Sequence, residues 1–194
     1  MTKSARIKPR KSPRQTRSVA TVDALVEAGA RVLSQEGYER ASVNRIAQIA
    51  GVSVGSLYQY FPSKEALVAA VVERHSQRML EVFQKDIVEL AHVPMPDAVR
   101  GIVARTFEAY ALDPGLRRVI LDEVPQLGAM ARSTDFDAWL AIAIKGYLTF
   151  HADVVRPQNL DLAVRILTTA VEAVAQAVLV NEPEQLRSHC VEPR

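Results

Sequence analysis

Apolar side chains recur at every third or fourth position along most of the chain, which is the spacing of amphipathic helices. The first predicted helix runs from about Val19 or Val22 to Glu36. Gly37 should end it, because glycine enters the left-handed conformation at little cost. Gly29 lies on the apolar face of this helix, where it costs about 1 kcal/mol of helix propensity relative to alanine. A glycine at that position could allow another helix to approach closely.

Two short helices are predicted next, each preceded by a serine that can cap it. Ser42 precedes the first, which Gly51 closes, and Ser53 precedes the second, over about residues 54–60. Residues 52–60 also alternate in part between apolar and polar side chains, so a short strand is the alternative. The cap position of Ser53 favours the helix.

The rest of the chain is also predicted to be helical. Ser63 should cap a long fourth helix that extends to about Ala91. Further helices are expected over residues 97–111, from Asp113-Pro114 onward, over 135–154 and over 160–180, with a short segment after Pro183. No segment shows convincing strand alternation, and no repeat is visible. The sequence therefore predicts an all-α fold.

Residues 42–61 carry the features of a helix-turn-helix. Ala47 is small enough to let two helices cross closely, and Gly51, four positions later, tolerates the positive φ of a tight turn. The shared core would come from apolar residues before, inside and after the turn: Ile46, Ala50, Val52 and Leu57. All six residues occur in register, so the sequence predicts a helix-turn-helix. An ordinary helical hairpin is the alternative.

The net charge of +2 conceals a strong asymmetry. Residues 1–75 contain 12 Lys and Arg against 6 Asp and Glu, whereas residues 76–194 contain 12 against 16. Residues 1–18 hold seven basic residues, two prolines and no acid, which predicts a flexible basic arm. A basic first third is typical of a segment that meets a polyanion, although a basic tail that only aids solubility is an equal alternative.

Composition excludes several classes of protein. The single cysteine, Cys190, excludes an internal disulfide framework and cysteine-rich zinc sites. The N-terminus carries no apolar run, so we expect neither a secretory signal nor an anchor there, and a cytoplasmic location. The four histidines are scattered, and no phosphate-binding loop, nucleophile elbow or paired carboxylates are present. We therefore expect no catalytic residues, metal site or cofactor, and no enzyme.

The run SVNRIAQIAGVSVGSLYQYFPSKEAL resembles the signature of the TetR (tetracycline-repressor) family of transcriptional regulators, and the resemblance extends from about Val19 to Met79. It implies a three-helix DNA-binding domain over residues 19–79, joined by a long fourth helix to a helical effector-binding and dimerisation domain over 80–194. It also implies a sequence-specific DNA-binding regulator, a homodimeric repressor that a small molecule releases from double-stranded operator DNA.

The resemblance further implies which residues meet DNA. Ser42 would hold a phosphate through its hydroxyl and backbone amide, and Asn44 stands where the family often has arginine. Arg45 is either a DNA contact or a solvated charge. The base-facing positions of the recognition helix are Val54, Gly55, Ser56 and Gln59, and the phosphate-binding positions are Tyr58, Tyr60 and Lys64. Gln59 can pair bidentately with adenine. Either tyrosine could instead belong partly to the core.

The second part of the chain suggests an effector site and a dimer seam. Residues 160–180 are apolar nearly all round, which predicts burial on two sides, against a second subunit or within one. Arg165 and Glu172 make a membrane span costly. The candidate contacts for a largely apolar effector are Phe107, Tyr110, Trp139, Tyr147 and His151, within a wider wall that includes Met130, Ile142 and Phe150. The alternative is that these residues are simply core.

Two other functions remain open at this stage. One is an architectural or nonspecific DNA-binding protein without an effector, and the other is an all-helical ligand carrier or enzyme. The first predicts similar affinity for random and operator DNA. The second predicts no DNA binding.

Overall fold

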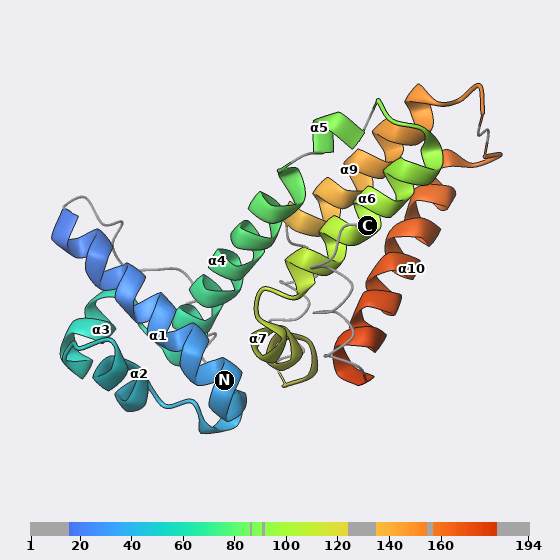
Figure 1. Ribbon diagram of the computed structural model, residues 1–194. Coiled ribbons are helices and arrows are strands. Elements are labelled where there is room, and N and C mark those ends of the chain that lie inside the picture. Colours follow the sequence, from blue (N-terminus) through green and yellow to red (C-terminus); the bar gives the residue numbers. More distant parts are fainter. Residues whose placement is uncertain (1–15, 86, 91, 124–134, 155–156, 182–194) are drawn as a thin grey trace, which may run out of the picture. The chain divides into compact units, whose positions relative to one another are not determined.

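The computed structural model describes residues 16–85, 87–90, 92–123, 135–154 and 157–181. All regular elements in these ranges are helices, which confirms the predicted fold class (Figure 1). The elements are α1 (Thr16–Arg40), α2 (Val43–Ile49), α3 (Val54–Tyr60), α4 (Lys64–Gln84), α5 (Ile87–Leu90), α6 (Met95–Tyr110), α7 (Pro114–Arg118), the π-helical turn η1 (Val119–Glu123), α9 (Asp135–Phe150) and α10 (Leu160–Asn181). Met130, the segment after Pro183 and the first 15 residues of the predicted basic arm lie outside the described residues.

The chain divides into two compact units, and α4 contributes to both. Among the described residues, unit 1 consists of residues 16–75 and 115–123, and unit 2 of residues 76–114 and 135–181. The segment that forms most of α7 and η1 thus packs with the first helices, although it follows α6 in the chain. The boundary near residue 79 stays a sequence-based prediction.

The core of unit 1 is formed by α1, α2, α3, the first half of α4 and the segment 115–123. Its largest fully buried side chains include Leu25, Leu33, Ile46, Leu57, Phe61, Leu67 and Leu116. Gly29 lies where α1 meets α4, and a β-carbon at this position would be only 3.0 Å from Cγ2 of Val71. The close helix approach that a glycine there permits is therefore realised.

Three predicted helix ends were wrong, and one of them is that of α9, which ends at Phe150 rather than near Val154. Helix α1 already includes Thr16, ahead of the predicted start at Val19 or Val22, so residues 16–18 of the predicted arm are helical, and no proline between Pro13 and Pro62 interrupts this segment. Helix α4 ends at Gln84 rather than near Ala91. The break after α4 lets α5 turn onto α6, where Leu90 packs against the position of Gly101. A continuous helix would carry Leu90 away from this contact.

Unit 2 is built from the second half of α4 together with α5, α6, α9 and α10, and Figure 1 shows α6, α9 and α10 side by side within it. Its buried cluster includes Met79, Phe83, Tyr110, Leu140, Ile144 and Val164. Lys145 of α9 also donates to Asp161 of α10 at 2.6 Å. Within the described ranges, no helix combines the length and the apolar content needed to cross a bilayer.

Candidate nucleic-acid interface

The turn between α2 and α3 has the geometry of a helix-turn-helix. Gly51 adopts a φ of +69°, as its place in the sequence predicts, and a side chain there would be strained by the backbone alone. The Val52 amide then donates to the Ala47 carbonyl at 3.0 Å and closes the turn. Ala47 is only 1% exposed, so its small side chain belongs to the buried core of unit 1.

Local hydrogen bonds and apolar anchors fix α3. The Ser53 hydroxyl accepts from the Ser56 amide at 3.1 Å, which is an N-cap, and the alternative of a strand over residues 52–60 is wrong. Leu57 is buried in the core of unit 1, as predicted, and Phe61 is buried there as well. The Phe61 amide still donates to the Leu57 carbonyl at 2.9 Å and ends the helix. One side of α3 is thereby held against the unit.

The other side of α3 faces solvent. We call Gly55, Tyr58 and Gln59 the exposed face of α3, since all three are exposed and Tyr58 retains 46% of its surface. A β-carbon at Gly55 would have only the Ser53 hydroxyl within 4 Å, at 3.9 Å. The backbone at Gly55 is therefore accessible to solvent. The side chain of Gln59, which ends in a polar amide, lies one helical turn away on the same face.

The other predicted residues of α3 are less exposed. Ser56 is half-buried, and its hydroxyl lies 3.0 Å from that of Ser53. Val54 and Tyr60 are also half-buried, and both pack partly against the core of unit 1. These two side chains thus divide their surface between the core and solvent.

The predicted DNA contacts of α2 are exposed and lie around its N-terminus. The Ser42 hydroxyl caps the helix by accepting from the Arg45 amide at 3.2 Å. A hydroxyl that accepts one hydrogen bond can still donate its proton to a phosphate oxygen. Asn44, one residue into the helix, is exposed. Both polar groups are thus available at the end of α2 where the helix dipole favours an anion.

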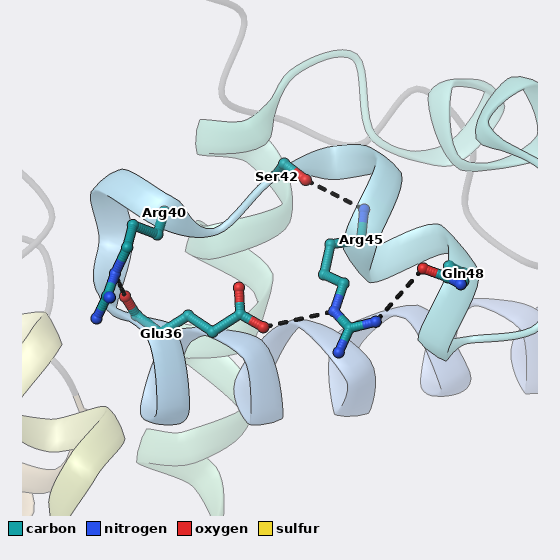
Figure 2. A network of polar contacts seen from close by, with 5 residues as sticks. All are labelled: Glu36, Arg40, Ser42, Arg45 and Gln48. Carbon is teal, nitrogen blue, oxygen red and sulfur yellow. Dashed lines mark hydrogen bonds and ion pairs between the residues drawn. The ribbon is translucent and has the colours of Figure 1, made fainter.

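Arg45 takes part in a polar network within unit 1 (Figure 2). Its Nε lies 3.5 Å from Oε1 of Glu36, and its Nη1 donates to Oε1 of Gln48 at 3.4 Å. Arg40 donates to the Glu36 backbone carbonyl at 2.9 Å in the same network. Half of the Arg45 side chain is nevertheless exposed. A phosphate would therefore compete with Glu36 for the guanidinium.

Lys64 begins α4 and is held by Tyr38. Its Nζ donates to the Tyr38 carbonyl oxygen at 2.5 Å and lies 4.0 Å from the centroid of the Tyr38 ring. Next to it, Ser63 caps α4 by accepting from the Ala66 amide at 3.2 Å, as the sequence predicts. Hydrogen bonds from its own backbone amide and from the Ser63 side chain lower the pKa of Glu65. The capped first turn of α4 thus holds the backbone of Lys64 in a defined conformation.

The candidate effector residues fall into two groups within unit 2. Tyr110 is fully buried, and Phe107 and Trp139 pack partly buried against the same cluster. The Trp139 ring meets that of Phe83 edge-on, with centroids 6.5 Å apart. Tyr147 and His151 form the second group near the end of α9, where their rings are 4.3 Å apart. The Tyr147 hydroxyl donates to the Val93 carbonyl at 3.3 Å. Their role toward an effector stays a prediction.

Sequence reasoning did not single out Tyr38 or Glu123. The Tyr38 amide donates to Oε2 of Glu123 at 2.7 Å, across 85 residues of chain. Gly37 precedes this amide with φ +79° and ψ 171°, a conformation reserved for glycine, so the helical geometry is interrupted at Gly37 as predicted, but as a kink within α1, which continues to Arg40. Only the glycine gave a local signal, because a contact over such a separation leaves no periodic pattern.

Comparison with protein families covers most of the chain. Residues 25–71 match the family of bacterial regulatory proteins named tetR, and residues 94–192 match the tetracyclin repressor-like C-terminal domain. The transcriptional regulator UidR of Escherichia coli K12 is 30% identical over 125 residues, which are 61% of each chain. The fatty acid metabolism regulator of Bacillus subtilis is 27% identical over 124 residues, 64% of this chain and 60% of the relative. The matches thus span less than two thirds of these relatives.

Solved structures share the fold over nearly the whole chain. A TetR-family regulator from Mesorhizobium loti superposes with a TM-score of 0.70 and 21% identity, over 91% of this chain and 94% of the other. FadR from Bacillus subtilis, solved in complex with stearoyl-CoA, gives a TM-score of 0.69 and 19% identity over 87% and 92%. The C-terminal family match alone spans more than half of the residues. The chain therefore belongs to the TetR family of bacterial regulatory proteins.

Proposed function

We propose that this protein is a sequence-specific DNA-binding transcription regulator that acts as a homodimer and releases operator DNA when a largely apolar small molecule binds unit 2. The observation that carries the proposal is the exposed face of α3. A capped helix is anchored by Leu57 and Phe61 on one side and presents Gly55, Tyr58 and Gln59 to solvent on the other. A short helix of this kind enters the major groove in helix-turn-helix proteins.

The residues around α3 supply the phosphate contacts of the proposal. Lys64 and the capped N-terminus of α2 would grip the backbone on either side of the groove, while Gln59 reads a base edge. Phosphate contacts fix the position of the helix but carry no sequence information. Specificity in this proposal therefore depends on Gln59 and on the close approach that Gly55 permits.

A second copy of the chain is the proposed partner of α9 and α10. On α10, the exposed residues Leu162, Ile166, Ala170, Ala173 and Ala177 recur at helical spacing and form one apolar face. On α9, Ile142 and Phe150 expose 65% and 67% of their surfaces. Small alanines beside larger side chains suit close helix packing. Two-fold symmetry would then present two α3 helices to successive major grooves.

The effector of the proposal is a largely apolar molecule, because the buried cluster of unit 2 and the side chains packed against it are mainly apolar and aromatic. Phe107 and Trp139 are partly buried against the core. In this proposal, the two side chains repack around the bound effector. FadR from Bacillus subtilis was solved with stearoyl-CoA, which makes long-chain acyl-CoA the first class to test. A ligand releases DNA only as far as it prefers the conformation that binds DNA poorly.

The experiment that tests the proposal is selection of bound duplexes from a random pool by the full-length protein. We expect an enriched sequence with two-fold symmetry and half-sites about one helical turn apart or a multiple of it. Retention of all sequences alike would support an architectural protein instead. Retention of none would support a ligand carrier or an enzyme.

A further inference from the structure

The backbone of Tyr38 is held by two charged side chains from distant parts of the chain, one at its N–H and one at its C=O, which belong to two successive peptide groups. Its N–H donates to Oε2 of Glu123 at 2.7 Å, and its carbonyl accepts from Nζ of Lys64 at 2.5 Å. Glu123 ends η1, and Lys64 begins α4. One residue at the end of α1 thus links the two side chains, and all three belong to unit 1.

The backbone conformation of Gly37 and its lack of a side chain both allow the Glu123 carboxylate to reach the Tyr38 amide. Its φ of +79° and ψ of 171° turn the Tyr38 amide out of the helical direction of α1. A β-carbon at Gly37 would lie 2.8 Å from Oε2 of Glu123, too close for any other residue unless the carboxylate moves. A hydrogen bond from an amide to an ionised carboxylate is about twice as strong as one between neutral groups. Glycine at position 37 therefore both orients the Tyr38 amide and leaves space for the Glu123 carboxylate that accepts from it.

Tyr38 in turn determines where the Lys64 ammonium lies. The lysine stem has four carbons and carries about 2 kcal/mol of rotamer entropy when it is free. The Tyr38 carbonyl and the ring face beneath it, 4.0 Å from Nζ, together select one position. An ammonium has three donors, so a phosphate oxygen can still accept a hydrogen bond from Nζ. A fixed ammonium loses less entropy when it binds that phosphate.

We propose that Glu123 is a positioning residue for DNA binding: by holding the Tyr38 N–H it fixes the backbone conformation of this residue, and thereby the carbonyl that positions Lys64 to receive a phosphate. This inference rests on the proposed function, because it assumes that Lys64 contacts DNA. It assigns a role in DNA binding to an acidic residue that lies outside the helix-turn-helix and more than 50 residues beyond it in the sequence.

The inference predicts an effect opposite to that of simple electrostatics. A carboxylate on a DNA-binding unit repels the polyanion, so its removal alone should strengthen binding. If Glu123 positions Lys64, its removal weakens binding instead. Asp122 precedes it in η1, is exposed, and carries the same charge. Asp122→Ala is therefore a matched control for charge.

The test measures DNA affinity of the full-length protein against salt concentration, on the duplex selected as above. Lys64→Ala should lower the log–log salt slope by about 1, the value for one phosphate contact. Glu123→Ala should likewise lower the affinity and the salt slope. In a Lys64→Ala background it should have no further effect. Glu123→Gln keeps an acceptor for the Tyr38 amide and should restore the slope. Asp122→Ala should bind at least as tightly as the unaltered protein.

Each outcome bears on a different claim. Unaltered binding by Lys64→Ala would remove the phosphate contact from the proposed function. Loss in Lys64→Ala without loss in Glu123→Ala, or losses that add fully in the double variant, would overturn only the role of Glu123. If thermal melting shows that Glu123→Ala does not fold, Glu123→Asp replaces it, because it keeps the charge but withdraws the carboxylate by one methylene. It should then show the lowered slope, and an unaltered slope would overturn the inference.

Discussion

The Arg45 guanidinium lies 3.5 Å from the Glu36 carboxylate, so α1 and α2 are joined by an ion pair beside the predicted DNA-binding surface. Half of the Arg45 side chain and a third of the Glu36 side chain are exposed, and exposed pairs of this kind are worth at most about 1 kcal/mol. A phosphate can therefore replace the glutamate at small cost. The pair thus restrains Arg45 in the protein without DNA, and the Glu36→Gln substitution tests whether a phosphate takes the place of the glutamate.

Glu36→Gln should strengthen DNA binding, because the neutral amide holds the guanidinium less firmly. We expect an increase in affinity of up to about fivefold, the equivalent of an exposed ion pair, in fluorescence anisotropy with labelled duplex. Glu39→Gln makes the same change of charge on an exposed residue of α1 and is the control. An equal increase in an Arg45→Ala background would show that the effect of Glu36 does not act through Arg45.

The local features of the helix-turn-helix could be predicted from sequence because their signals lie within a few residues of the structures they produce. Ser42, Ser53 and Ser63 each cap the helix that follows, and Gly37 and Gly51 both have positive φ. A hydroxyl or a missing β-carbon acts on the neighbouring peptide groups. No knowledge of the rest of the fold is needed.

Features that depend on distant contacts could not be predicted. The end of α4 at Gln84 reflects the packing of Leu90 near Gly101, and the bond from Tyr38 to Glu123 joins residues 85 apart. The burial of Val54 and Tyr60 also depends on which face of α3 meets the core. Helical periodicity gives the apolar face of a helix but not its partner.

Gly55→Ala should increase the stability of the protein and weaken its binding to DNA. An alanine there would meet only the Ser53 hydroxyl, at an unstrained 3.9 Å, so the helix should gain roughly 0.5–1 kcal/mol in the free energy of unfolding, measured with urea. The added methyl group lies on the exposed face of α3 and would hold the helix away from the bases. We expect DNA binding to weaken by about 1 to 3 kcal/mol, the value of one base contact. Unchanged DNA affinity would exclude this face from the groove.

Ile166→Glu should break the proposed dimer. Ile166 is 58% exposed on the apolar face of α10, and a carboxylate buried there against a second copy would cost several kcal/mol. Analytical ultracentrifugation should show a monomer, with DNA binding lost in parallel. Arg165→Glu changes an exposed polar residue of the same helix outside this apolar face and should remain dimeric. A dimer in both variants would place the subunit contact elsewhere.

Trp139 can report on the effector, because it is the only tryptophan in the chain. Its ring packs against Phe83 in the cluster of unit 2. Stearoyl-CoA should change the Trp139 emission in a saturable way and lower DNA affinity over the same concentration range, while coenzyme A without the acyl chain should do neither. No response of either kind to stearoyl-CoA would exclude this class of effector.

The most direct test of sequence-specific binding is the ratio of affinities for the selected duplex and for a scrambled duplex of equal length, measured at one salt concentration. A regulator that reads bases through the exposed face of α3 should prefer the selected duplex by about a thousandfold or more, and Gln59→Ala should reduce this ratio. A ratio near one in the unaltered protein would contradict sequence-specific recognition.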